Sequence, residues 1–195
     1  MTSLLEQLSP QHGLDIKSPR LRLRAVCPAD IHPLHAIRTD PIAMKYMTTG
    51  VDTEPDAEKS HSLVRMQMMI KPGNFAFAVT TTGAADECET VIGFIGIARP
   101  PEVFFIFSRA SWGKGYATEA LGAFLTTYWS NYPNGLQQMS QEHKDTLQAY
   151  VFDQNAGSSR VLEKAGFKQI GTVLGQIGDR NDVPQRVYEV RRPMG

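Results

Sequence analysis

The sequence predicts an α+β domain with a mixed, mostly antiparallel sheet of six to seven strands, flanked by about four helices. Apolar runs at 75–80, 91–97 and 103–107, joined by short connections, indicate three strands that pair as an antiparallel meander. The turn Gly113-Lys114-Gly115 then separates the last run from a long helix with one apolar face. The chain contains no internal repeat and no Pro/Ser-rich linker, which favours one domain.

A polar leader, residues 1–17, precedes the domain, which we expect to span residues 18–195. Residues 20–26 alternate charged and apolar side chains with a period of two, which is typical of a half-buried strand. Asp30 is a suitable N-cap for the helix that follows, because its short side chain can accept a hydrogen bond from a free backbone amide.

A second helix is predicted to begin at Thr53-Glu54-Pro55-Asp56, which resembles a capping box with proline near the first turn. The apolar face of this helix comprises Leu63, Met66, Met69 and Ile70 at helical spacing. Pro72-Gly73 is expected to end it.

The long helix after the glycine turn has apolar residues on one face from Ala117 to Tyr128. Residues 133–144 are polar and contain proline and glycine, so they are predicted to form a loop. A strand is expected to follow at 147–152.

A short helix and a hairpin are predicted to complete the domain. Asn155 can cap the helix at its start, and Gly166 is placed to end it. The runs 167–173 and 186–190 are then expected to close the sheet as two antiparallel strands.

The composition gives no sign of a nucleic-acid or membrane partner. Lys plus Arg and Asp plus Glu both number 20, so the net charge is zero. Cys27 and Cys88 lie far apart without metal-type spacing, which favours free thiols and leaves one disulfide as the alternative. No apolar run reaches membrane-spanning length, and the start lacks a signal-peptide pattern, so we expect a cytoplasmic protein.

The turn Gly113-Lys114-Gly115 predicts a phosphate site. Glycines between a strand and a helix leave backbone amides unobstructed at the positive end of the helix dipole. A P-loop is excluded because no Ser or Thr follows Lys114, and Thr118 stands where a dinucleotide fingerprint needs its third glycine. A phosphorylated ligand of another kind is therefore favoured.

Two stretches resemble the GNAT superfamily of N-acetyltransferases, in particular the branch of ribosomal-protein-alanine N-acetyltransferases, which also contains enzymes for small amines. Glu102 to Ala120 resembles the family's fourth strand, pyrophosphate loop and third helix. Asn155 to Phe167 is similar to its Asn-x-x-Ser segment and the Gly-Phe pair that follows. Because the two motifs occur in the right order, the resemblance implies the GNAT fold over roughly residues 18–192.

The resemblance implies that acetyl-CoA is the co-substrate and that no metal takes part. Amides from Arg109 to Gly115 would hold the pyrophosphate, and amides around Phe107 would polarise the acetyl carbonyl. Ala110 stands where the family often has Gln or Arg, and whether Arg109 substitutes is open. The implied cofactor-binding residues are Phe107, Ser108, Arg109, Trp112, Gly113, Lys114, Gly115, Tyr116, Ala117, Asn155 and Ser158.

Several of these residues have a purely structural alternative. The side chains of Trp112, Tyr116 and Ala117 are expected to pack at the junction of loop and helix. Lys114 either adds charge to a phosphate or is simply solvated. Asn155 either bonds the pantetheine arm or only caps its helix, and the two roles are compatible.

Two residues are candidates for catalysis. Glu102 lies where the branch commonly carries a glutamate near the substrate amine, and its carboxylate could take a proton from the ammonium. The alternative is a solvated glutamate. Leu162 occupies the position of the tyrosine that serves many relatives as general acid, so the resemblance leaves Ser158 as proton donor to the thiolate, or as an ordinary residue of the first helical turn.

We therefore expect an acetyl-CoA-dependent N-acetyltransferase that modifies a primary amine, on a small molecule or a protein N-terminus, by direct attack on the thioester. The alternative is a non-catalytic acyl-CoA-binding or sensing domain, which Leu162 and Ala110 favour. Zero net charge gives no support to docking on ribosomal RNA. No motif identifies the acceptor, and an exposed sheet edge leaves monomer and homodimer open.

Overall fold

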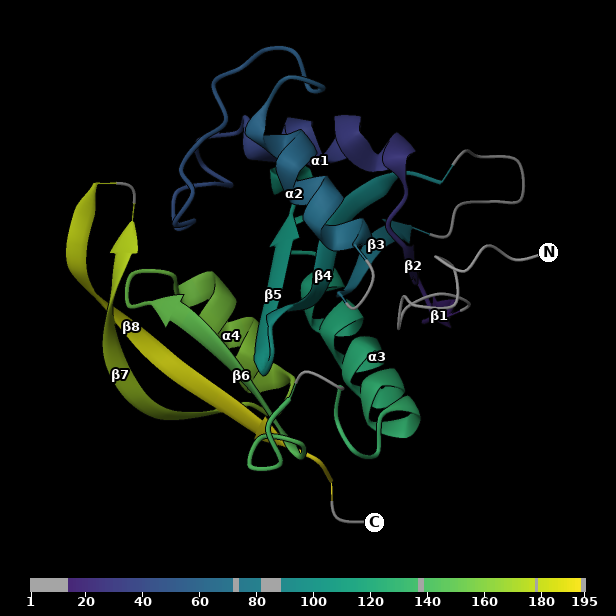
Figure 1. Cartoon of the computed structure of the whole chain (residues 1–195), viewed down its shortest axis with the longest axis vertical. Coiled ribbons are helices and arrows are strands. Elements are labelled where there is room, and N and C mark those ends of the chain that lie inside the picture. Colours follow the sequence, from purple (N-terminus) through teal and green to yellow (C-terminus); the bar gives the residue numbers. More distant parts are fainter. Residues whose placement is uncertain (1–13, 72–73, 82–88, 137–138, 178, 194–195) are drawn as a thin grey trace.

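The structure is a computed structural model that describes residues 14–71, 74–81, 89–136, 139–177 and 179–193 (Figure 1). These residues form one eight-stranded sheet in the order β1-β2-β3-β4-β5-β6-β8-β7, with four α-helices packed against it. Neighbouring strands are antiparallel except β5 and β6, which are parallel. The predicted α+β class with a mixed, mostly antiparallel sheet is confirmed.

The elements follow the predicted order, with one additional strand. The strands are β1 (Ile16–Lys17), β2 (Leu21–Ala25), β3 (Phe75–Thr81), β4 (Val91–Arg99), β5 (Glu102–Phe107), β6 (Thr146–Phe152), β7 (Lys168–Ile177) and β8 (Arg180–Arg191). The helices are α1 (Ile31–Arg38), α2 (His61–Ile70), α3 (Tyr116–Asn131) and α4 (Ala156–Lys164), with short 3-10 turns at Pro28–Asp30 and Arg109–Ser111. The additional strand is β1, which pairs with β2 from within the predicted leader, whose residues 1–13 lie outside the described ranges.

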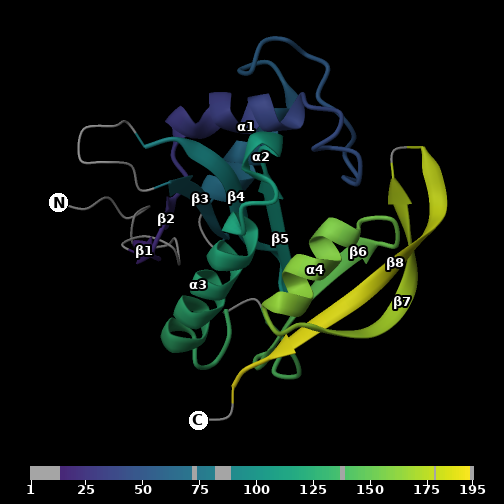
Figure 2. The same cartoon turned by 180° about the vertical axis from the view of Figure 1, so that it is seen from behind.

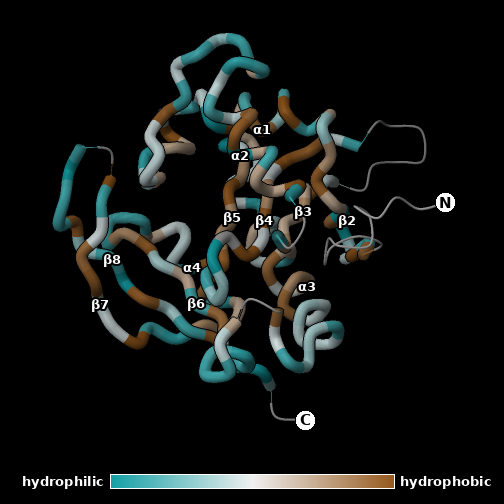
Figure 3. The backbone as a smooth tube through the Cα atoms, viewed as in Figure 1, coloured by the Kyte–Doolittle hydropathy of each residue, from teal (hydrophilic) through white to brown (hydrophobic). Residues whose placement is uncertain are grey.

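The central meander β2 to β5 supports a hydrophobic core on each face of the sheet. Alternate side chains of a strand point to opposite faces. Phe75 and Phe77 therefore pack with Phe124 of α3, whereas Ala76 and Ala78 pack under α1 and α2. Figure 2 shows α3 and α4 on the near face, and Figure 3 shows how apolar the central strands are.

The capping box predicted for the second helix is wrong. Glu54 Oε1 accepts a hydrogen bond from the Asp56 amide at 3.0 Å, which closes a turn instead of starting a helix. The helix α2 begins only at His61, after the N-cap Ser60, whose hydroxyl accepts from the Ser62 amide at 3.1 Å. The predicted start of this helix is therefore too early.

Asp30 precedes α1 as predicted, but its carboxylate does not cap that helix. The carboxylate accepts hydrogen bonds from the Arg24 guanidinium at 2.7 and 2.8 Å and from the Cys27 amide at 2.9 Å. Burial acts to raise the pKa of Asp30, but these hydrogen bonds outweigh it and lower the pKa below its usual range. The residue fastens β2 to the turn before α1.

The C-terminal third matches the predicted order but extends further. Asn155 caps α4, since its Oδ1 accepts from the Ser158 amide at 3.2 Å, and Gly166 follows the helix with φ of 92°. The hairpin β7–β8 is longer than predicted, and most of β7 is exposed. Figures 1 and 2 show this hairpin projecting toward the loop that follows α1. No helix within the described ranges is both long and apolar enough to cross a membrane.

Candidate active site

A break in the sheet creates the principal cleft. The parallel strands β5 and β6 share one register pair, Glu102 with Gln148, where the Gln148 amide donates to the Pro101 carbonyl at 2.9 Å. Beyond that pair the two strands separate, and a cavity of about 550 Å³ opens between them. The cavity reaches α4 on one face and the loop after α1 and the hairpin β7–β8 on the other.

The backbone of β5 presents free amides to this gap. The Ser108 amide donates to the Ile92 carbonyl of β4 at 2.9 Å, and hydrogen bonding alternates along an antiparallel strand. The amides and carbonyls of Phe105 and Phe107 therefore point the other way, toward β6. The indole N–H of Trp112 donates to the Phe107 carbonyl at 3.0 Å, which agrees with that orientation. Two amide donors are left at the edge of the gap.

The same alternation places the two predicted catalytic side chains on opposite faces of the sheet. Phe105 and Phe107 point to the α3 face, so Glu102 and Phe104 point to the face of α1 and α2. Ser158 belongs to α4, on the α3 face. Glu102 and Ser158 nevertheless line one continuous cavity, because the gap between β5 and β6 connects the two faces.

The predicted phosphate loop lies at the start of α3. Gly113 and Gly115 have φ of 74° and 80°, a region that side-chain-bearing residues rarely adopt. Gly115 is the N-cap and offers no side chain to the helix, whose first bond runs from the Glu119 amide to the Gly115 carbonyl at 3.0 Å. Within the described residues, the amides of residues 113–118 donate to no protein atom. They form a row of free donors at the positive end of α3.

Arg20, at the start of β2, holds this loop in place. Its Nη1 donates to the Lys114 carbonyl at 3.0 Å, its Nε and Nη2 contact the Glu119 carboxylate at 2.7 and 2.6 Å, and the guanidinium lies 4.8 Å from the centre of the Tyr116 ring. Ser18 also donates to Glu119 at 2.7 Å. Burial acts to raise the pKa of Glu119, but the hydrogen bonds from Ser18 and Arg20 outweigh it and lower the pKa.

Ser108 and Arg109 point away from the loop amides. Arg109 Nε lies 3.2 Å from Asp40 Oδ2 at the end of α1, and the Ser108 hydroxyl pairs with that of Ser111 at 2.7 Å. Both residues line a second cavity, of about 460 Å³, between α1 and the start of β4. The structure therefore separates them from the glycines with which the sequence motif groups them.

The side chains of Trp112 and Lys114 are exposed, and Tyr116 is half-buried beneath Arg20. Trp112 was expected to pack at the junction of loop and helix, but 48% of the residue is exposed. Its indole is held by the hydrogen bond to the end of β5. Lys114 makes no ion pair within the described ranges.

Glu102 is held by a neighbouring cation. Its Oε2 lies 2.9 and 3.1 Å from the Arg99 guanidinium, and a quarter of its side chain is exposed. Asn155, Ser158 and the buried Leu162 line the opposite part of the cavity. The polar groups that two distant motifs contribute are thus brought together around one cleft.

Four residues at this site were not predicted from the sequence: Arg20, Tyr46, Arg99 and Tyr150. Tyr46 spans the cleft, because its hydroxyl donates to the Gln154 carbonyl at 3.0 Å from a loop far away in the sequence. Only the position of Tyr150 had a detectable signal, since it alternates with the inward-facing Ala149 and Val151 of β6. No group of His, Cys, Asp or Glu suited to a metal ion occurs within the described ranges.

Comparisons with known proteins agree with this fold. The family model described as "Acetyltransferase (GNAT) domain" matches residues 20–168. No curated protein matches the sequence significantly. A GNAT-family acetyltransferase from Bacillus anthracis has a similar structure, with a TM-score of 0.70 and 24% identity over 91% of this chain and 98% of that one.

Two further structures have similar folds and were solved with ligands. The Microcin C7 self immunity acetyltransferase MccE, in complex with acetyl-CoA and AMP, has a TM-score of 0.68 and 13% identity over 89% of this chain and 93% of its own. Spermidine N-acetyltransferase from Vibrio cholerae, in complex with CoA and spermine, has a TM-score of 0.66 and 15% identity over 90% and 97%.

Proposed function

This chain belongs to the GNAT acetyltransferase family, and on that premise we propose that it transfers the acetyl group of acetyl-CoA to a primary amine by direct attack on the thioester. The observation that carries the proposal is the gap between β5 and β6, bordered by the amides of Phe105 and Phe107. A pyrophosphate on the free amides of residues 113–118 is the second anchor for the same donor. The molecules are expected in the cytoplasm, as a monomer or homodimer, without nucleic-acid or membrane partners.

The donor would occupy the gap as an extra strand. The amide groups of its pantetheine arm can pair with the free edge of β5, and Asn155 and Ser158 face the arm from α4. The amide of Phe107 or Phe105 then donates to the thioester oxygen, where negative charge develops during attack. We retain in this proposal the cofactor-binding residues expected from the sequence, with Ser108 and Arg109 supporting the turn through Ser111 and Asp40.

Glu102 and Ser158 lie on opposite faces of the sheet, and each would carry out one of the two proton transfers. Glu102, on the α1 and α2 face, accepts a proton from the acceptor ammonium, so that the neutral amine attacks and the C–N bond forms. Collapse of the intermediate breaks the C–S bond, and the Ser158 hydroxyl donates a proton to the departing thiolate. The nitrogen, which carries a positive charge after attack, loses one proton to solvent to give the neutral amide, and solvent restores the proton of Ser158.

A second candidate function is acyl-CoA binding without transfer. The observation that favours it is the Arg99 guanidinium, which already occupies the carboxylate of Glu102. Leu162, at the position of the family's tyrosine, also favours this non-catalytic function. The motif likeness to ribosomal-protein-alanine N-acetyltransferases makes a protein N-terminus one possible acceptor within the leading proposal.

Calorimetry with acetyl-CoA and an assay of CoA release with a panel of amines test the proposal. Ser158→Ala is expected to lower kcat about tenfold or more while acetyl-CoA affinity stays unchanged. Ser159→Ala is the matched control, because this neighbouring serine is buried away from the cavity and its hydroxyl has no partner among the described residues. Binding of acetyl-CoA with no CoA release from any amine would select the non-catalytic alternative.

A further inference from the structure

The acceptor side of the cleft carries almost no charge. Among the described residues that line the cavity, Arg99 and Glu102 are the only charged ones, and they form an ion pair with each other. Glu189 lies opposite Gln148 near the start of β6 but is bonded to Gln148 and Arg191. The cavity therefore offers one carboxylate for one ammonium, and no second acid for another.

The cavity also contains an apolar surface, which we call the acceptor wall, and the uncharged polar residues Thr48, Gln176 and Gln185 line the cavity beside it. The acceptor wall consists of Met47, Phe104, Tyr150, Phe152, Val173 and Leu174. Tyr150, Val173 and Leu174 are 42%, 41% and 65% exposed, although residues of this size are normally covered. Exposed apolar side chains that converge on one cleft gain free energy when an apolar ligand covers them.

We propose that the acceptor is a small primary monoamine carried on an aromatic or branched aliphatic group, and that Leu174 helps to select it. This inference rests on the proposed function. The ammonium lies beside Glu102 on the α1 and α2 face, and the apolar group lies against the acceptor wall. Discrimination follows from how few charges line the cavity. The second ammonium of a polyamine would be desolvated without a partner, and Arg99 could pair with at most one of the two carboxylates of an amine such as glutamate.

The hairpin provides a matched pair of variants. Leu174 and Ile170 both lie on β7 and are 65% and 55% exposed, but only Leu174 lines the cavity. Leu174→Glu adds a carboxylate to the acceptor wall, and Ile170→Glu adds the same charge to the same strand outside the cavity. Because both side chains are largely exposed, neither change removes core packing.

The experiment measures kcat/KM by CoA release for 2-phenylethylamine, spermidine, glutamate and a short peptide with an N-terminal alanine. The wild type should prefer 2-phenylethylamine over each of the others by at least about tenfold, a difference that burial of one aromatic ring can provide. Leu174→Glu should lower kcat/KM for 2-phenylethylamine about tenfold and raise it for spermidine, whereas Ile170→Glu should change neither. Leu174→Lys should lower the first without raising the second, and melting curves check that all variants are folded.

The results that would contradict the acceptor class, the role of Leu174 and the proposed function differ from one another. A wild type that prefers spermidine, glutamate or the peptide overturns the acceptor class but keeps the acetyltransferase. Equal behaviour of Leu174→Glu and Ile170→Glu removes Leu174 from selection. Acetyl-CoA that binds but releases no CoA with any amine overturns the proposed function, and the acceptor class with it.

Discussion

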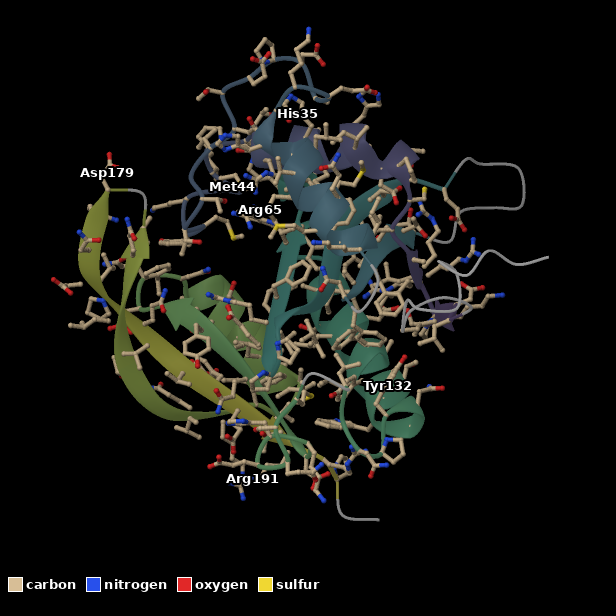
Figure 4. The ribbon with its side chains drawn as sticks, in the orientation of Figure 1. His35, Met44, Arg65, Tyr132, Asp179 and Arg191 are labelled. Carbon is tan, nitrogen blue, oxygen red and sulfur yellow. The ribbon has the colours of Figure 1, made fainter. Side chains whose placement is uncertain are left out.

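The loop of residues 113–118 and the acceptor wall are the two proposed binding regions, and they are built in different ways. The loop is one continuous segment, whose donors are backbone amides placed by two glycines and the start of α3. The acceptor wall gathers side chains from the loop after α1, from β5 and β6, and from the hairpin β7–β8. Figure 4 labels Met44 in that loop and Asp179 in the turn of the hairpin, which mark the position of these two elements. The contrast teaches that recognition by local backbone geometry can be encoded in a few adjacent residues, whereas recognition by a side-chain surface depends on the whole fold.

The two regions also differ in how firmly they are held. Arg20 ties the loop to β2 and α3 through several hydrogen bonds and an ion pair. The hairpin carries Val173 and Leu174 on a largely exposed edge strand. A rigid donor site beside a less supported acceptor wall predicts that substitutions in the loop will have larger effects than those in the wall.

The largest effect is expected from Gly113→Asp. A side chain at φ of 74° would obstruct the amides, and its negative charge would repel the pyrophosphate, so acetyl-CoA affinity should fall at least about 100-fold by calorimetry. Gly166→Asp is the control, because Gly166 also has a positive φ and open space around it but lies outside the loop. If both variants lose the same acetyl-CoA affinity, the loss comes from backbone strain and not from repulsion of the pyrophosphate.

A smaller effect, confined to chemistry, is expected from Glu102→Gln on the acceptor side. The amide keeps the shape of the carboxylate but cannot take a proton, so kcat should fall about 10- to 100-fold while acetyl-CoA affinity stays unchanged. Glu102→Asp should restore part of the rate. If Glu102→Gln turns over at the wild-type rate, the residue only pairs with Arg99.

The anchor of the loop should show in the pH dependence of stability. The pKa of Glu119 is lowered in the folded protein, so this carboxylate stabilises the fold above its unfolded-state pKa, near 4.3, and the contribution is lost as pH falls through the folded value. Glu119→Gln should therefore melt several degrees lower than the wild type at pH 7, and the difference should shrink below about pH 4. Glu142→Gln, at an exposed site, should melt like the wild type throughout.

The smallest effect is expected from Tyr46→Phe. The substitution removes the hydroxyl that donates to the Gln154 carbonyl across the cleft, in an exposed hydrogen bond. The KM for the amine should rise about twofold, consistent with one exposed hydrogen bond, and acetyl-CoA affinity should not change. A comparable loss of acetyl-CoA affinity would show that Tyr46 supports both regions equally.

Features that depend on adjacent residues could be predicted from the sequence, whereas features that depend on contacts between distant parts of the chain could not. The sequence correctly predicted the α+β class, the order of the helices and strands from residue 20 onward, and the caps of α4, because each depends on periodicity or on adjacent residues. It placed the start of α2 too early, at Thr53 to Asp56, because a local capping pattern does not show whether the backbone continues as a turn or as a helix. The pairing of β1 with β2 was not predictable from two residues.

At the site, the glycine loop, Asn155 and Ser158 were recognised because they lie in short motifs. Tyr46 was not, since its partner Gln154 is distant in sequence and the contact depends on the path of an irregular loop. The orientation of Arg109 toward Asp40 was missed for the same reason. A local pattern can identify a residue but not the direction in which its side chain points.

The meeting of β5 and β6 at one register pair bears on the order in which substrates add. The sheet is built as two units, β1 to β5 and β6 to β8, joined at Glu102 and Gln148. Phe104 belongs to the first unit, and Tyr150 and Leu174 belong to the second. A donor that pairs with the edge of β5 would fix the two units relative to each other and so complete the surface on which the amine lies. We therefore expect an obligatory sequence with acetyl-CoA first, in which CoA inhibits competitively against acetyl-CoA but not against the amine.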